Sequence, residues 1–145
     1  MSITASGLYG LTLEKCFING AAINLEAEDN KVALVNDSHT PDFNAHDFFA
    51  DLTNEVSGTG YTGGGAALTG TQITISSGVL TYDATDLAWT SSSIPSAMAG
   101  IGYADAVTDE LIFCSDFVTA ASTTNGTFTI QWNASGIFTL DYTPA

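Results

Sequence analysis

Beyond Ile75 the chain is a succession of short segments rich in Val, Ile, Thr and aromatic residues, separated by turns at intervals of about 8–12 residues. In the clearest segment, Gly126–Asn133, apolar residues alternate with Thr and Gln. This two-residue period places one face of a strand against a core and leaves the other face in solvent. Strands of this length and spacing predict an antiparallel β-sandwich or a small barrel.

The expected strands begin with the apolar run Lys31–Asn36. Further strands are expected at Gly78–Tyr82, Leu87–Ser91, Ala99–Ala104, Glu110–Val118, Gly126–Asn133 and Gly136–Tyr142. The last two flank a short polar turn, so we expect them to pair as a terminal hairpin.

Two segments have helical character. Leu11–Phe17 is one, and Ala45–Leu52 is predicted to be the more regular of the two. In the second segment apolar residues recur at helical spacing on one side, with Asp47 and Asp51 opposite. Asn44 precedes it and is a suitable N-cap.

The chain contains 145 residues, a normal size for one domain. Residues 1–7 are mostly polar, and we expect a flexible N-terminal arm there. Residues 8–145 are expected to form a single, mainly β domain with one or two short helices.

The net charge is −14, and Lys15 and Lys31 are the only basic residues. Nucleic acids are bound through cationic side chains, so the composition excludes nucleic acid as a partner. Docking on an anionic membrane surface is disfavoured for the same reason. No apolar run approaches the roughly 18–20 residues of a membrane span, so we expect no membrane association.

Two cysteines, Cys16 and Cys114, stand next to or near Phe residues in apolar settings. We expect both to be buried free thiols, as is usual in a reducing compartment. The alternative is a disulfide closing a loop of about 100 residues, which adds roughly 4–5 kcal/mol in the entropic description.

One cluster has residue types that suit a metal site: His39, Asp42, His46 and Asp47. His39 precedes a Pro turn and His46 begins the expected helix, so nothing in the sequence makes the two converge. We therefore expect turn and capping roles, with no bound metal.

Catalytic patterns are missing from the sequence. There is no Gly-x-Ser-x-Gly motif, and the glycines between Gly58 and Gly65 lack the Lys of a phosphate-binding loop. Neighbouring acids such as Asp83 and Asp86, or Asp109 and Glu110, are typical of turns. We expect no enzymatic activity and no cofactor.

Aromatic residues offer two interpretations. Trp89, Trp132, Tyr82 and Tyr103 are suited to stacking against a sugar, or to packing in the core. Trp132 lies on the apolar side of its alternating strand, which favours the core for this residue. We also expect Trp89 to pack in the core.

One long segment has a distinctive pattern. It contains TPD at Thr40–Asp42, AHD at Ala45–Asp47, NEVSGTGYTGG at Asn54–Gly64 and LTG at Leu68–Gly70. Together with GTFTIQW at Gly126–Trp132 and ASGI at Ala134–Ile137, this pattern resembles a family of small virion proteins of tailed phages, of the head decoration or minor capsid type.

The resemblance implies a non-enzymatic protein that binds the outer surface of a phage head and stabilises the major capsid lattice. Its partner would be the major capsid protein, its location the virion after synthesis in the host cytoplasm, and its state a homo-oligomer, with a trimer favoured. The contact candidates are the arm and the loop Thr53–Gly65, with Ser2, Ile3, Thr4, Asn54, Glu55, Ser57, Thr59, Tyr61 and Thr62. The alternative is a tail or fibre module that binds a host receptor or carbohydrate.

Overall fold

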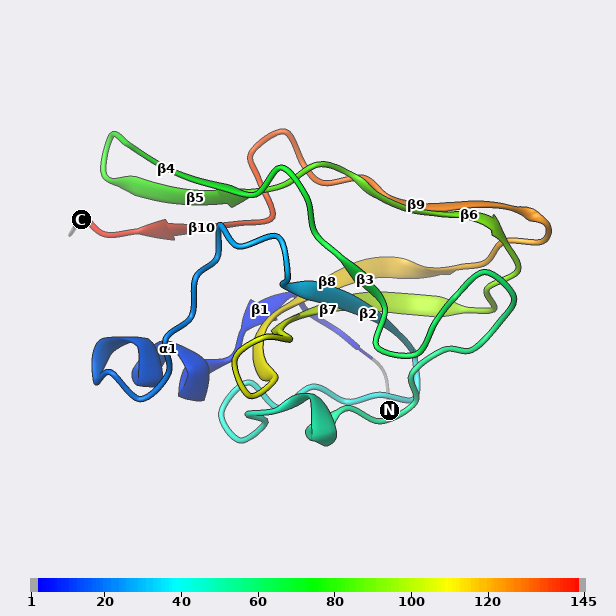
Figure 1. Cartoon of the computed structure of the whole chain (residues 1–145), viewed down its shortest axis with the longest axis horizontal. Coiled ribbons are helices and arrows are strands. Elements are labelled where there is room, and N and C mark those ends of the chain that lie inside the picture. Colours follow the sequence, from blue (N-terminus) through cyan, green and yellow to red (C-terminus); the bar gives the residue numbers. More distant parts are fainter. Residues whose placement is uncertain (1–2, 144–145) are drawn as a thin grey trace.

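Two small antiparallel sheets pack on one face of a five-stranded antiparallel sheet, a long irregular segment covers part of the other face, and a short helix lies at one end of the molecule (Figure 1). The computed structural model describes residues 3–143. Its elements are β1 (Gly7–Leu8), α1 (Gly10–Phe17), β2 (Lys31–Asn36), the 3₁₀ turn η1 (Phe49–Asp51), β3 (Ala66–Ala67), β4 (Gln72–Ser76), β5 (Val79–Asp83), β6 (Leu87–Ser92), β7 (Ala97–Ala104), β8 (Glu110–Ala121), β9 (Gly126–Ile130) and β10 (Phe138–Asp141). None of the described helices is long and apolar enough to cross a membrane.

The large sheet has the order β1-β8-β7-β2-β3, and the small sheets are β10-β5-β4 and β6-β9. No sheet closes on itself, so the expected β-sandwich is confirmed and a barrel is not formed. The sheets form one compact domain, with one helix besides the 3₁₀ turn among residues 3–143.

The central strand β2 shows why this sheet is covered on both faces. Val32 and Leu34 enter the core between the large sheet and the two small sheets. Ala33 and Val35 point the opposite way, into a second core on the other face. All four are fully buried, because alternate side chains of a strand point to opposite faces and both faces are covered here.

Aromatic side chains fill much of the first core. Trp89, Trp132 and Tyr82 are buried in it, which confirms the core interpretation of both tryptophans. The indole N–H of Trp132 donates to the carbonyl of Thr85 at 3.2 Å, so the polar group of this buried ring has a hydrogen-bond partner within the protein. Tyr103 is buried in the second core.

The expected terminal hairpin is wrong. β9 pairs with β6, whereas β10 pairs with β5, so the last two strands belong to different sheets. The polar turn exists, because the N–H of Gly136 donates to the carbonyl of Asn133 at 2.8 Å. The N–H of Ile137 then donates to the carbonyl of Tyr82, which directs the chain away from β9 and onto β5.

The expected helix Ala45–Leu52 is also wrong, since only the 3₁₀ turn Phe49–Asp51 forms. Phe48 is extended, and the Asp51 carboxylate accepts the N–H groups of Asp47 and Phe48. The proposed cap Asn44 does not act as one, since its own N–H donates to the carboxylate of Asp42. Carboxylates therefore take backbone donors that a helix would use.

Two elements of the N-terminal half lie at or close to their predicted positions. α1 begins one residue before the predicted helix, and β2 has the predicted bounds. The described part of the expected flexible arm is packed: Ile3 is buried in the second core, and Gly7 pairs with Cys114 in β8. The expectation that both thiols are buried holds for Cys114 only; Cys16 is exposed on α1, and the two are not bonded to each other.

Candidate functional site

The loop Thr53–Gly65, which was predicted to contact a partner, is tied to the large sheet at its start. The N–H of Asn36 donates to the carbonyl of Asn54, and the N–H of Val56 donates to the carbonyl of Leu34. Glu55 forms an isolated antiparallel bridge with Val35. The first residues of the loop therefore extend the hydrogen bonding of β2.

Tyr61 fixes the rest of the loop from inside. Its hydroxyl accepts the N–H of Leu34 at 2.9 Å and donates to Glu55 Oε1 at 2.6 Å. The same carboxylate oxygen accepts the N–H of Gly64 at 2.7 Å, and the Tyr103 hydroxyl donates to the Gly64 carbonyl at 2.7 Å. Burial, followed by the hydrogen bond to Glu55, raises the pKa of Tyr61, so its hydroxyl keeps its proton and remains a donor.

This network divides the candidate contact residues of the loop into two groups. Glu55 is half-buried and Tyr61 is buried, so these two hold the loop and offer little to a partner. The side chains exposed on the outside of the loop are Asn54, Ser57, Thr59 and Thr62. Sequence reasoning located the loop but did not separate the residues that hold it from those it displays.

The arm candidates are distributed differently. Ile3 faces the interior, and its N–H donates to Asp37 Oδ1 at 3.3 Å, so its side chain is unavailable at the surface. Thr4 is exposed. Ser2 lies outside the described residues. Of the described arm candidates only Thr4 is exposed, whereas the loop exposes four of its candidates.

The two histidines approach each other, which the sequence gave no reason to expect. The ring centroids of His39 and His46 are 5.8 Å apart. His39 is fully buried, and its Nδ1 lies 3.4 Å from the N–H of Thr53, which it accepts. Within residues 3–143 no group of three His, Cys, Asp or Glu side chains is placed to hold a metal ion.

Burial, and secondarily the charge of His46, lowers the pKa of His39. In the unfolded chain His39 is therefore protonated near pH 6.5, whereas in the folded chain it stays neutral to lower pH. The free energy of unfolding falls as the pH drops below about 6.5. We expect a loss of up to about 1.4 kcal/mol per pH unit in urea titrations between pH 6.5 and 5.5. His39→Gln should flatten this slope, whereas His46→Gln should retain most of it; equal slopes in the wild type and His39→Gln would contradict the assignment.

Neither thiol is suited to nucleophilic chemistry. Burial, and then Asp116, raises the pKa of Cys114 to about 12. The pKa of Cys16 is also raised, first by desolvation and then by Glu110. A reactive cysteine needs a depressed pKa to populate the thiolate, and the environments of both residues act in the opposite direction.

Three of the neighbouring acids stand at or beside the ends of strands: Asp83 ends β5, Asp86 precedes β6 and Glu110 begins β8. Asp83 accepts the N–H of Ala84, and Asp86 accepts the N–H of Trp132 at 2.9 Å. The Glu110 carboxylate is buried, with the hydroxyl of Thr108 at 2.7 and 2.8 Å from its two oxygens. These contacts give each of the three acids a structural role, although Asp83 and Glu110 stand at strand ends and not in the turns that the sequence predicted.

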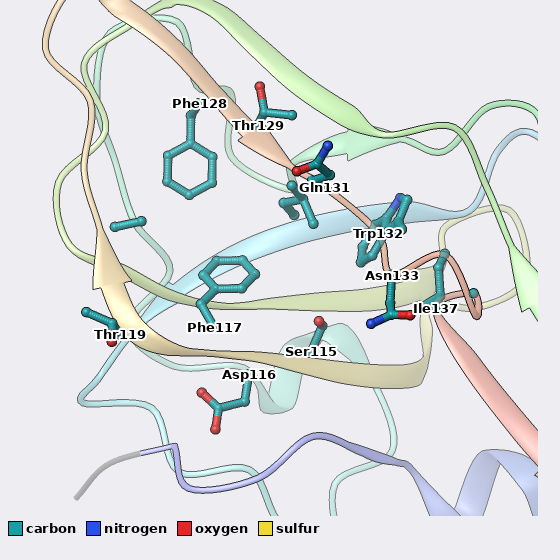
Figure 2. A pocket seen from close by; sticks show the side chains of 13 residues that line it. Ser115, Asp116, Phe117, Thr119, Phe128, Thr129, Gln131, Trp132, Asn133 and Ile137 are labelled. Atoms are coloured by element: carbon teal, nitrogen blue, oxygen red, sulfur yellow. The ribbon is translucent and has the colours of Figure 1, made fainter.

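A groove with a cavity of about 430 Å³ opens between β8, β9 and the turn that precedes β10 (Figure 2). Phe117 of β8 lines it and is half-buried, whereas Phe128 of β9, with its ring centroid 6.2 Å from that of Phe117, is buried beneath it in the first core. Polar side chains from Asp116, Gln131 and Asn133 accompany them. Aromatic surface beside amide and carboxylate groups is a combination that suits a small polar ligand such as a sugar.

The alternative of a sugar platform is not formed by the residues considered for it, since Trp89, Tyr82 and Tyr103 are buried in the two cores. Of these four residues, only Trp132 borders the groove.

No protein-family model, curated protein or solved structure matches this chain. The function therefore has to be argued from the residues and contacts of the chain itself.

Proposed function

We propose that this protein is a non-enzymatic decoration protein that binds the outer surface of a tailed-phage head and stabilises the major capsid lattice. The observation that carries the proposal is the fixed loop Thr53–Gly65, which contains the longest of the motifs that carry the resemblance. Glu55 and Tyr61 hold this loop from within, while Asn54, Thr59 and other polar side chains stay exposed. A loop fixed before binding loses little conformational freedom on docking.

Charge specifies the kind of surface that this protein would dock on. Lys15 Nζ lies 2.7 Å from Asp47, and Lys31 Nζ lies 3.0 Å from Asp105, so both cations are already engaged within the chain. With a net charge of −14, the protein presents carboxylates to its surroundings. The complementary region of the major capsid protein would be basic, and salt would weaken the encounter.

Stabilisation of the shell would follow from binding linkage. A ligand that binds the assembled lattice and not its separated subunits shifts the equilibrium toward the lattice. Many copies, or a trimer that contacts several capsid subunits at once, would multiply modest individual contacts. This mechanism needs no catalytic group.

The direct test uses phage heads that lack the protein. Purified protein added to such heads is expected to bind in a saturable manner and to raise their disruption temperature, with affinity falling as salt increases. Sedimentation measures the binding, and dye access to packaged DNA reports the disruption. A failure to bind at every salt concentration would refute the capsid proposal.

The role of the loop is tested with a matched pair of charge variants. Thr62→Lys places a cation on the exposed face of the loop, whereas Thr74→Lys places the same charge on an exposed position of β4. If the loop meets a basic surface, the first variant should bind heads at least about 10-fold more weakly, equivalent to about 1.4 kcal/mol, and the second should change little. Equal weakening would remove the loop from the interface.

The groove in Figure 2 favours a second function, a tail or fibre module that binds a receptor sugar. Gold-labelled antibody on virions separates the two functions, because label on the tail contradicts the head role. Sugar binding would alter the fluorescence of Trp132, which borders the groove, and Gln131→Ala should abolish that response. An absence of any response to a panel of host sugars would remove the second function.

A further inference from the structure

An apolar cavity of about 520 Å³ lies between α1, the segment that follows it, and the sheet β10-β5-β4. Its walls come from three separate parts of the chain. The principal lining side chains are Leu13, Cys16, Ile73, Leu80, Phe138 and Leu140. A cavity of this size and composition is within the range of ligand-binding pockets.

The sheet contributes one complete face to this cavity. Ile73 pairs with Tyr82, and Ile75 pairs with Leu80, so the alternate residues of β4 and β5 put these side chains on the same side. The inner end of that face is covered, since Tyr82 is fully buried. The outer end is open, and Ile75 is 67% exposed.

Exposed apolar side chains occur on or next to the same elements that form the cavity. Phe17 and Ile18 directly follow the lining residue Cys16 and are 87% and 67% exposed. Tyr142 follows β10 and is 56% exposed. Together with Ile75, these four are most of the large apolar side chains exposed among residues 3–143. Figure 1 shows α1, β4, β5 and β10 at one end of the molecule, and such a concentration marks an interaction surface.

The charges at this opening are acidic. Glu26 lines the cavity, and the exposed Glu14 follows the lining residue Leu13 on α1. Lys15 adds no free cation, because its Nζ donates to both carboxylate oxygens of Asp47 at 2.7 Å. An occupant therefore has to bring apolar side chains and positive charge together.

We infer that this apolar groove is a docking site for a segment of another protein in which apolar residues alternate with Lys or Arg. An extended segment matches the groove because the side chains of β4 and β10 that face it also recur every second residue. A second copy of this chain matches this groove less well than a basic segment, since each copy carries −14 and both lysines are already paired. The inference does not depend on the capsid role.

The test uses three short synthetic peptides labelled with a fluorophore: Leu alternating with Lys, Leu alternating with Glu, and Ser alternating with Lys. Fluorescence anisotropy against the full chain at fixed salt measures their affinities. The Leu/Lys peptide is expected to bind at least about 10-fold more tightly than either of the others, a difference of about 1.4 kcal/mol. No binding of the Leu/Lys peptide, or equal binding of Leu/Lys and Ser/Lys, would overturn the inference.

Two variants on adjacent residues of β4 place the binding on the groove. Ile75→Lys and Thr74→Lys both replace an exposed side chain and add one positive charge, but on opposite faces of the strand. Ile75→Lys should weaken the Leu/Lys peptide at least about 10-fold, and Thr74→Lys less than about 2-fold. Equal weakening would show general attraction to an acidic protein and would contradict a groove site. Head binding is scored separately with the same variants, so failure of one proposal leaves the other measurable.

Discussion

Gly65→Ala is expected to destabilise the fold by about 3 kcal/mol. Gly65 has a φ of +78°, a region that L-residues rarely occupy, and it closes the fixed loop against β2. A Cβ placed there would collide with the carbonyl oxygen of Val32, which is backbone of the central strand and cannot rotate away. The backbone cost and the steric cost therefore add.

Urea denaturation at neutral pH measures this effect as a shift in midpoint at constant slope. Gly63→Ala is the matched control, because the nearest atom to its added Cβ is Glu55 Oε2 at 4.0 Å and its φ is not positive. The control is expected to change stability by less than about 0.5 kcal/mol. Similar losses in both variants would show that loop composition matters and the contact with Val32 does not.

Lys15→Met is expected to cost about 2–3 kcal/mol, a large effect for a side chain near the surface. Lys15 Nζ binds the Asp47 carboxylate and lies 3.9 Å from Glu110, which is 3% exposed. It also lies 4.1 Å from the centroid of the Phe48 ring. Its removal leaves a buried carboxylate without its nearest cation, and uncompensated buried charge is costly.

Lys31→Met is the control, since it removes the only other cation and alters net charge by the same amount. Lys31 pairs with Asp105 at 3.0 Å, but both side chains are more than a third exposed. Water screens such a pair, and we expect a loss of about 0–1 kcal/mol. Thermal unfolding of both variants in one buffer checks the ranking; an equal loss would indicate that total charge, and not the buried site, governs stability.

The sequence predicted strands better than it predicted their partners. A continuous apolar run marks β2, and a two-residue period marks β9, which is why β2 has the expected bounds and the C-terminal strands lie close to expectation. Pairing depends on contacts between distant segments, so the turn Asn133–Gly136 suggested a hairpin where the chain crosses between two sheets. Periodicity carries no information on that choice.

Helices show the same limit in a different way. The apolar spacing of Ala45–Leu52 was real, since Phe49 and Leu52 do pack against the second core. What it did not reveal was that Asp42 and Asp51 would take the local backbone donors. Side-chain hydrogen bonds of this kind compete with a helix and are decided by tertiary placement.

The candidate sites were foreseen in part. The loop Thr53–Gly65 was located from its composition. The hydrogen bond by which Tyr61 holds this loop, however, depends on the amide of Leu34, which lies in β2. The apolar groove joins α1, β4–β5 and β10, and no local pattern brings those segments together. A site assembled from distant segments becomes visible only once the topology is known.

The crossing of the chain between the two small sheets also has a consequence for how this protein folds. The hairpin β4–β5 forms from neighbouring residues, but its third strand follows only after β6, β7, β8 and β9. A two-stranded hairpin is marginally stable alone, so the apolar face of β4–β5 waits for a partner distant in sequence. Such non-local pairing is associated with folding in milliseconds to seconds, and during that interval the acidic residues that surround this face would help to keep separate chains apart.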